Sequence, residues 1–327
     1  MSVIFMNLVA VLVSFALTVA FGKMVIPWLI KLKFGQSILE IGPNWHKNKQ
    51  GTPTMGGIMF ILGIGLTVLL AGIPLMIFDG DFRHLIIFGF ALVFGVIGFI
   101  DDYAKVSKKE NKGLSALQKL LLQLAASAVF LTVLRISGDL TPSLTLPFAG
   151  TVKLPWLLYL FLMLFVIVGA VNAVNLTDGV DGLATSVTLP VALMFGALAF
   201  VLSTPGIGLF AAALFGALCG FLLYNRNPAK VFMGDTGSLF LGGAIVGLAF
   251  AFDLPLILLF AGIIYIAETL SVILQVTYFK LTHGKRLFKM SPIHHHFEMC
   301  GWSENKLCVV FTLIGAVGCL IGFFGAI

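Results

Sequence analysis

The sequence predicts an all-α polytopic membrane protein with about ten transmembrane helices. Of its 327 residues, 59% are hydrophobic and 10% are charged, whereas an ordinary soluble domain has about 25% charged residues. The apolar residues also form long runs, and about 20 such residues cross a bilayer as a helix. This composition excludes a soluble enzyme, a disordered chain and a disulfide scaffold. We therefore treat residues 1–327 as a single integral membrane domain.

Ten apolar runs are expected to span the bilayer, and all are longer than the ~10-residue strands of a membrane barrel. They are residues 3–30, 54–72, 84–100, 116–136, 154–173, 185–203, 206–224, 237–252, 254–280 and 306–326. No Lys or Arg precedes the first run and no small-residue cleavage site ends it, which predicts a retained span rather than a signal peptide. Between the fourth and fifth runs, the Gly, Pro and alternating Leu, Thr and Ser of 138–153 favour a small hairpin.

Basic residues mark one side of the predicted membrane domain. Most of the 20 Lys and Arg residues lie in alternate connections, around 31–49, 105–119, 226–230 and 280–306. By the positive-inside rule this side is cytoplasmic, and ten spans then place both termini outside. The net charge of +6 thus reflects membrane topology, and we expect no nucleic-acid partner. The four cysteines include no CxxC pair, so neither a disulfide framework nor a zinc site is indicated.

Aspartates gather where spans meet the cytoplasm. Asp101 and Asp102 directly follow the third apolar run, and adjacent carboxylates repel each other unless a cation lies between them. Lys105 lies at i+4 and i+3 from them, within reach of both on a helix. Oxygen ligands of this kind suit a hard cation such as Mg²⁺. The alternative is a solvated helix end with an ordinary ion pair.

A second polar cluster has a spacing of three residues. Asn175, Asp178 and Asp181 recur in this way, and a helical turn would place their side chains on one face, although an ordinary turn between two spans is the alternative. A third cluster, Phe232 to Ser238, places Asp235 at the start of an apolar helix. Helix N-termini suit phosphate, so Asp235 is either an N-cap or a metal ligand beside a phosphate site.

Three histidines follow a helix-start signal. Ser291 is expected as the N-cap and Pro292 as the first helical residue, with the histidines in the first turn. Successive residues on a helix point about 100° apart, so we expect anion and substrate contacts rather than one shared metal. In the segment 49–57, Thr52 or Thr54 caps the second span and Lys49 reaches a phosphate. No Walker A sequence is present.

These clusters together predict a reaction at one membrane face. Carboxylates for Mg²⁺, basic side chains and helix starts for phosphates, and a bilayer edge fit phosphoryl transfer from a soluble nucleotide-linked donor to a lipid acceptor. Bound Mg²⁺ would neutralise the charge of a diphosphate.

The motifs resemble those of the polyprenyl-phosphate N-acetylhexosamine-1-phosphate transferase superfamily, and most closely the bacterial phospho-N-acetylmuramoyl-pentapeptide transferases. The matching strings are GTPTMGG, DDYAK, NAVNLTDGVDGL, VFMGDTGS, ETLSVILQV and SPIHHHFE, in this order from residue 51 to residue 298. The resemblance implies that undecaprenyl phosphate attacks UDP-N-acetylmuramoyl-pentapeptide, giving lipid I and UMP in peptidoglycan synthesis. It also implies Mg²⁺ as cofactor, a homodimer, and a multi-pass protein of the bacterial inner membrane whose active site faces the cytoplasm.

The resemblance carries roles over to individual residues. It implies that Asp101, Asp102, Asp235, His294 and His295 are catalytic, with Asp235 as the metal ligand and Asp101 as the acceptor of the lipid phosphate proton or a second metal contact. The implied substrate contacts are Lys49, Thr54, Lys105, Lys119, Asn175, Asp178, Asp181, Asn225, Phe232, Gln275 and His296, with Phe232 stacking on uracil. Glu268 lies in the ninth span, which is bent in this family and borders a lipid groove, and we expect a structural role for it.

Two other functions compete with this interpretation. A related transferase using another UDP-hexosamine would share most of the motifs, and the segment 285–304 with its histidines distinguishes it. A lipid transporter would place polar residues in mid-membrane within paired repeats. Here the polar residues lie at one face and no internal repeat is evident.

Overall fold

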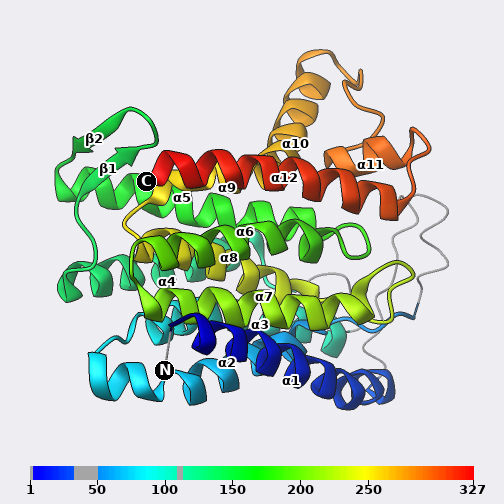
Figure 1. The fold of residues 1–327 in the computed structure, drawn as a ribbon. Helices are drawn as coiled ribbons and strands as arrows, with labels where there is room; N and C mark the ends of the chain where they lie inside the picture. Colours follow the sequence, from blue (N-terminus) through cyan, green and yellow to red (C-terminus); the bar gives the residue numbers. More distant parts are fainter. Residues whose placement is uncertain (1–2, 33–50, 109–112) are drawn as a thin grey trace.

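The computed structural model describes residues 3–32, 51–108 and 113–327. Most of them form long helices that run side by side (Figure 1). The helices are α1 Val3–Lys31, α2 Gly57–Ala71, α3 Arg83–Lys108, α4 Ala116–Ser137, α5 Trp156–Thr177, α6 Leu183–Val201, α7 Pro205–Asn225, α8 Gly234–Ala251, α9 Leu258–Ala261, α10 Ile263–Leu281, α11 Ile293–Glu298 and α12 Glu304–Ala326. A π-helical turn, η2, covers Leu75–Asp79, and a 3₁₀ turn, η3, covers Pro255–Ile257.

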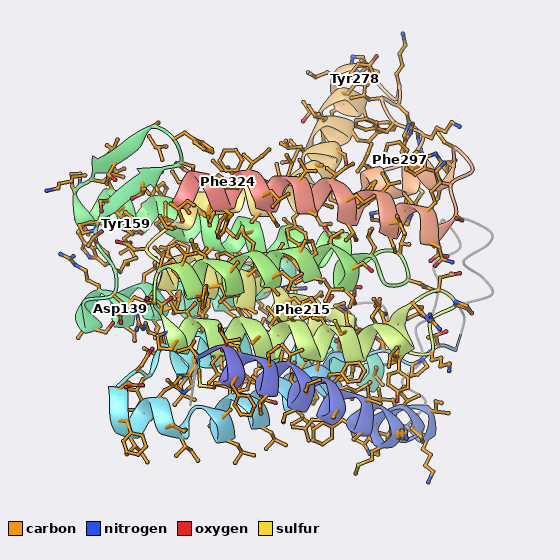
Figure 2. The ribbon with its side chains drawn as sticks, in the orientation of Figure 1. Asp139, Tyr159, Phe215, Tyr278, Phe297 and Phe324 are labelled. Atoms are coloured by element: carbon orange, nitrogen blue, oxygen red, sulfur yellow. The ribbon has the colours of Figure 1, made fainter. Side chains whose placement is uncertain are left out.

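The predicted fold class is confirmed. Within the described residues, nine helices are long and apolar enough to cross a membrane, and the remaining predicted span, 54–72, forms the 15-residue helix α2. The apolar segment continues past α2 into η2, which ends before Gly80 in the left-handed conformation. Large apolar side chains on the outer helices are exposed, such as Phe324 of α12 (Figure 2) and Phe161 and Phe165 of α5. A surface of this kind needs a hydrocarbon solvent.

The ninth predicted span is not one continuous helix. Residues 254–280 divide into η3, the short helix α9 and then α10, which starts after Gly262. In Figure 1, α10 leans away from the other helices, so its far end stands apart from the bundle. Many of its side chains are exposed as a result, including Leu270, Ile273 and Leu274.

Both termini lie at the same end of the bundle (Figure 1). The predicted hairpin of 138–153 is also at this end and is confirmed, with strands β1 Ser143–Leu146 and β2 Gly150–Lys153 paired antiparallel. The loop between α10 and α11 lies at the opposite end. The two ends of the bundle therefore differ. The termini and the hairpin lie at one end, and the polar clusters predicted as a site lie at the other.

Helix α8 forms the centre of the bundle. All its residues from Thr236 to Phe250 are buried, and it packs closely against α3 and α5. Glycines permit this approach, because a Cβ on Gly242 would contact the backbone of Val171, and one on Gly243 the backbone of Ala91. Small residues at helix contacts are the usual means of close packing in membranes. This packing fixes the place of Asp235 at the α8 N-terminus.

Candidate active site

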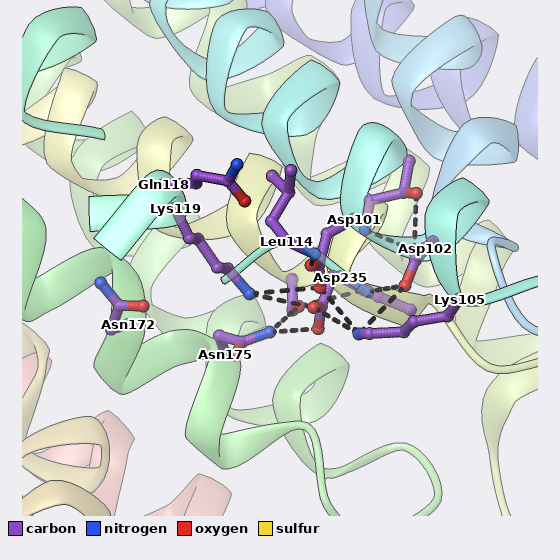
Figure 3. A network of polar contacts seen from close by, with 12 residues as sticks. Asp101, Asp102, Lys105, Leu114, Gln118, Lys119, Asn172, Asn175 and Asp235 are labelled. Atoms are coloured by element: carbon purple, nitrogen blue, oxygen red, sulfur yellow. Dashed lines mark hydrogen bonds and ion pairs between the residues drawn. The ribbon is translucent and has the colours of Figure 1, made fainter. Parts of the chain in front are cut away.

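The last turns of α3 and α5 and the first turns of α4 and α8 come together around one network of polar contacts (Figure 3). Helix α3 brings Asp101, Asp102 and Lys105 from its last turns, and α8 brings Asp235 in its first turn. Lys119 lies in the first turn of α4, and Asn175 in the last turn of α5. Residues far apart in the sequence thus form one connected polar cluster, here called the carboxylate–lysine cluster.

Asp235 is the centre of this cluster. Its Oδ2 accepts hydrogen bonds from Lys105 Nζ and Lys119 Nζ, both at 2.9 Å, and its Oδ1 accepts one from Asn175 Nδ2 at 2.8 Å. The Asn175 amide also reaches Ser238 Oγ, one turn further along α8, at 2.7 Å. Two lysine ammonium groups thus gather at one oxygen of Asp235. Positive groups held in place in this way can stabilise anionic groups that react beside them.

Asp101 links α3 to the start of α4. Its Oδ2 lies 2.8 Å from Lys105 Nζ, the i,i+4 pair that the sequence predicts, and 3.7 Å from Lys119 Nζ. Its Oδ1 accepts a hydrogen bond from the Leu114 N–H at 2.6 Å. Directly after Leu114, Ser115 caps α4 in a capping box with Gln118. Asp101 therefore fixes the helix start that presents Lys119.

Asp102 forms its hydrogen bonds with the start of α8 and not with a lysine. Its carboxylate accepts hydrogen bonds from the Asp235 N–H at 3.2 Å and from the Thr236 N–H and hydroxyl at 2.8 and 2.7 Å. Lys105 Nζ is more distant, at 3.8 Å from Asp102 Oδ1. The Asp102 carboxylate therefore caps α8: it accepts hydrogen bonds from free N–H groups of the first turn, as an N-cap side chain does, but it belongs to a different helix, α3.

The three evenly spaced residues Asn175, Asp178 and Asp181 do not share one face, contrary to the prediction. Helix α5 ends at Thr177, Asp178 is its C-cap, and Gly182 turns the chain in the left-handed conformation. Only Asn175 reaches Asp235. The Asp181 carboxylate instead accepts hydrogen bonds from Asn227 Nδ2 at 3.2 Å and the Ala229 N–H at 2.9 Å, so it holds the loop between α7 and α8.

Asp178 lies in a strongly acidic environment. Burial raises the pKa of its carboxyl well above the usual range, and the neighbouring carboxylates of Asp235, Asp102 and Asp181 add to this effect. A raised pKa favours the protonated form of this carboxyl group, and that form can donate a hydrogen bond. Asp178 is thus suited to donate to an acceptor oxygen or nitrogen of a substrate.

Several predicted substrate contacts hold loops in place. Asn225 accepts a hydrogen bond from the Thr185 hydroxyl at 2.8 Å and donates to the Val231 carbonyl at 3.0 Å. Gln275 Oε1 accepts the N–H groups of Leu287 at 3.1 Å and Phe288 at 2.8 Å, which folds the loop after α10 back onto that helix. Asn225 thus holds the loop that leads to Asp235, and Gln275 holds the loop that leads to the histidines.

The segment before α2 packs against the segment before α8. Phe232 is half-buried, and its N–H donates to the Pro53 carbonyl at 2.9 Å. A Cβ built on Gly234 would lie 2.8 Å from Thr54 Oγ1 and 2.6 Å from Asp102 Oδ2. Thr54 and Asp102, both predicted site residues, therefore border the start of α8. Lys49 lies outside the described residues.

The histidines do not converge on one point. The His294 ring lies 3.0 Å from Glu268, the His295 ring lies 2.6 Å from Glu298, and His296 Nδ1 accepts the Lys289 N–H at 3.1 Å. The helix starts at Ile293 with Pro292 as N-cap, one residue later than predicted, and Ser291 is not the cap. Glu298 and Thr236 are partners that the sequence motifs did not predict, although Glu298 stands at i+3 from His295, a spacing at which helical side chains meet.

The carboxylate oxygens of Asp101 and Asp235 fit a divalent cation that is bound partly by the protein and partly by the substrate. Among the described residues, no group of three or more His, Cys, Asp or Glu side chains is arranged to hold a metal ion. Asp101 and Asp235 nevertheless converge on Lys105 Nζ, at 2.8 and 2.9 Å, so a cationic group already lies between two carboxylates. Mg²⁺ in proteins is commonly bound by one or two carboxylates together with substrate phosphates.

Comparison with known proteins identifies the family. A profile described as glycosyl transferase family 4 matches residues 84–253, and one described as phospho-N-acetylmuramoyl-pentapeptide-transferase signature 1 matches residues 49–61. Relatives named phospho-N-acetylmuramoyl-pentapeptide-transferase are 46% identical in Carboxydothermus hydrogenoformans, over 99% of both chains, and 46% identical in Clostridium botulinum, over 96% of this chain and 94% of the relative. A third, in Staphylococcus carnosus, is 45% identical over 97% and 98%. The chain belongs to the phospho-N-acetylmuramoyl-pentapeptide-transferase family.

Proposed function

We propose that this protein transfers phospho-N-acetylmuramoyl-pentapeptide from its UDP-linked donor to undecaprenyl phosphate, forming lipid I and releasing UMP in peptidoglycan synthesis. The observation that carries the proposal is the pair of lysines, Lys105 and Lys119, on one oxygen of Asp235. The near full-length identity to transferases of that name supports it. The resemblance extends the proposal to a homodimer in the bacterial inner membrane, with its site facing the cytoplasm.

The lysines have a direct role in this reaction. Both partners of the transfer carry phosphate, and each Lys is a point charge that pairs with a phosphate oxygen. Lys105 and Lys119 bind Asp235 through single flexible side chains, so either one can turn to a diphosphate that enters beside them. Charge developing on the diphosphate in the transition state is then balanced by groups already in place.

Mg²⁺ is the proposed cofactor. Asp235 would hold the ion, with Asp101 as a second oxygen donor, and the bound ion would neutralise the diphosphate and stabilise the leaving UMP. Asp102 keeps Asp235 in position through the start of α8. Asp101 also accepts the proton from a lipid phosphate monoanion when the dianion is not already formed.

The donor nucleotide is assigned to the side of the cluster formed by α5 and the α7–α8 loop. Asn175 is oriented by Asp235 and Ser238, and Asp178 with its raised pKa donates a hydrogen bond to the nucleotide. Phe232 offers an aromatic face for uracil next to Thr54. His295 and His296 on α11 are half-buried and are assigned to the donor beyond the diphosphate.

The test is UMP release by the protein in detergent with undecaprenyl phosphate and Mg²⁺. We expect release with UDP-N-acetylmuramoyl-pentapeptide and none with UDP-N-acetylglucosamine, whereas the related hexosamine transferase would show the reverse. Asp235→Asn and Asp101→Asn should each abolish release while the protein stays folded. Full activity of both variants would refute the proposed site, and lipid translocation without UMP release would support the transporter alternative.

A further inference from the structure

Glu268 is a completely buried carboxylate in the middle of the apolar helix α10. Its exposed fraction is 0%, and so is that of His294, its partner from α11. Glu268 Oε2 lies 3.0 Å from His294 Nδ1 and 3.4 Å from the His294 N–H. Burying a polar side chain costs free energy unless it is hydrogen-bonded. Packing alone therefore gives no reason for a carboxyl group here.

The pairing joins one ring nitrogen of His294, Nδ1, to a carboxyl oxygen of Glu268. When that carboxyl is ionised it only accepts hydrogen bonds, and Nδ1 is then the donor. The other nitrogen, Nε2, is buried and has no hydrogen-bond partner within the described residues. It faces Gly179, because a Cβ built on that glycine would overlap Nε2 and Cε1 of the ring. The imidazole thus joins α10 to the turn 178–182 between α5 and α6.

This turn carries Asp178 and is held from two further sides. The Asp181 N–H donates to Glu304 of α12 at 3.0 Å, and the Asp181 carboxylate accepts the Ala229 N–H at 2.9 Å. The His294 ring supplies the third contact, from the side of α10. Three separate elements therefore determine where Asp178 lies relative to Asp235.

The neighbouring histidine has the same kind of support. His295 Nδ1 lies 2.6 Å from Glu298 Oε2, and Glu298 is also buried. The two imidazole rings meet edge to face with centroids 4.2 Å apart. A shift of His294 would therefore move His295 as well, and with it the part of α11 assigned to the donor.

We propose that Glu268 is a positioning residue for the transfer: by holding His294 through Nδ1, it fixes α11 and the turn 178–182, and so sets Asp178 and His295 for the UDP-linked donor. The inference rests on the proposed function, since it assumes that this side of the cluster binds the donor. Glu268 acts through His294 and touches no substrate itself.

The test is the steady-state kinetics of Glu268→Leu, which replaces the carboxyl with an apolar group of similar size and removes the acceptor for His294 Nδ1. We expect kcat/KM for the UDP-linked donor to fall by about 100-fold, the usual effect of a misplacement of about 1 Å. The KM for undecaprenyl phosphate should stay within about twofold. The melting temperature should fall, because the buried Nδ1 of His294 loses its partner. Wild-type kcat/KM in this variant would overturn the proposal, as would equal losses for both substrates.

A second variant displaces the same His294 ring from the opposite side, at Nε2. Gly179 does not have a positive φ, so Gly179→Ala strains no backbone and acts only by displacing the His294 ring. It should reproduce the selective loss, and the double variant should be no worse than either single one, since both remove one interaction. If the losses of the two single variants multiply in the double variant, the proposal is overturned. If Glu268→Leu fails to fold, Gly179→Ala alone is the test.

Ser271→Ala is the matched control. Ser271 is buried in the same helix, and its hydroxyl donates to the Glu268 carbonyl at 2.6 Å, so the variant changes a polar group of α10 without touching the His294 contact. Its kinetics should equal those of the wild type. If the wild-type protein is inactive with the muramoyl-pentapeptide donor but active with another UDP-hexosamine, the proposed function fails. The same variants then test the positioning role with that donor.

Discussion

Asp102 Oδ2 accepts two hydrogen bonds from Thr236, one from the backbone N–H at 2.8 Å and one from the hydroxyl at 2.7 Å. The two residues are on different helices, α3 and α8, and both are buried. A side chain of one helix thus serves as the cap of another. Through this contact, the position of Asp235 depends on α3 as well as on its own helix.

Thr236→Val should destabilise the protein by about 1–3 kcal/mol, because the Asp102 carboxylate loses a hydrogen bond in a buried place while the side-chain shape is kept. Thermal unfolding in detergent measures this. Thr132→Val is the control, since the Thr132 hydroxyl is exposed and bonds only to the Ala128 carbonyl of its own helix. Equal melting temperatures for the two variants would show that the cap contributes nothing.

Gly98→Ala should reduce turnover by at least about 100-fold. A Cβ at residue 98 of α3 would collide with the backbone carbonyl of Asp235, so α8 must move away from α3. Gly89→Ala, on the same helix, meets open space and should retain full activity. UMP release by the two variants is compared. Both gain the same helix propensity, so a difference between them reports the contact between α3 and α8.

Lys119→Met should lower turnover by about 100-fold or more, because one of the two charges on Asp235 is lost and a positioned donor of this kind is worth that much. UMP release at saturating substrates measures the loss. Lys153→Met, on the exposed strand β2 at the other end of the bundle, is the control for loss of a basic residue. Equal activity of the two variants would exclude a role for Lys119 in phosphate binding.

Asp81→Asn should destabilise the protein in a pH-dependent way. Burial acts to raise the pKa of Asp81, but the Arg83 guanidinium, with the N–H groups of Arg83 and Gly206, outweighs it and lowers the pKa. A lowered pKa gives stability that is present above the ordinary Asp value of about 3.9 and lost as the pH falls through the folded-state value.

The Asp81→Asn variant should therefore unfold more easily than wild type by about 1–3 kcal/mol near neutral pH, and the difference should shrink in acid. Melting temperatures across pH check this. Asp79→Asn is the control, because Asp79 is exposed. A difference that grows as the pH falls would contradict the assignment.

Local spacing predicted part of the site. The Asp101–Lys105 pair was predictable because i,i+4 neighbours on a helix are in reach whatever the tertiary fold, and the hairpin because its turn residues are local. The contact of Lys119 with Asp235 joins residues 116 positions apart, and only helix packing brings it about. The even spacing of Asn175 and Asp181 misled because it assumes a continuing helix, whereas α5 ends between them.

The burial of α8 separates the reaction from the properties of the bilayer. Helices in contact with lipid tilt or shift when the hydrocarbon thickness changes. Helix α8 is buried from Thr236 to Phe250 and so has no hydrophobic length of its own to match. Changes in acyl-chain length are then taken up first by the outer helices and by α10. Asp235 keeps its depth in the bundle, because its own helix does not face lipid.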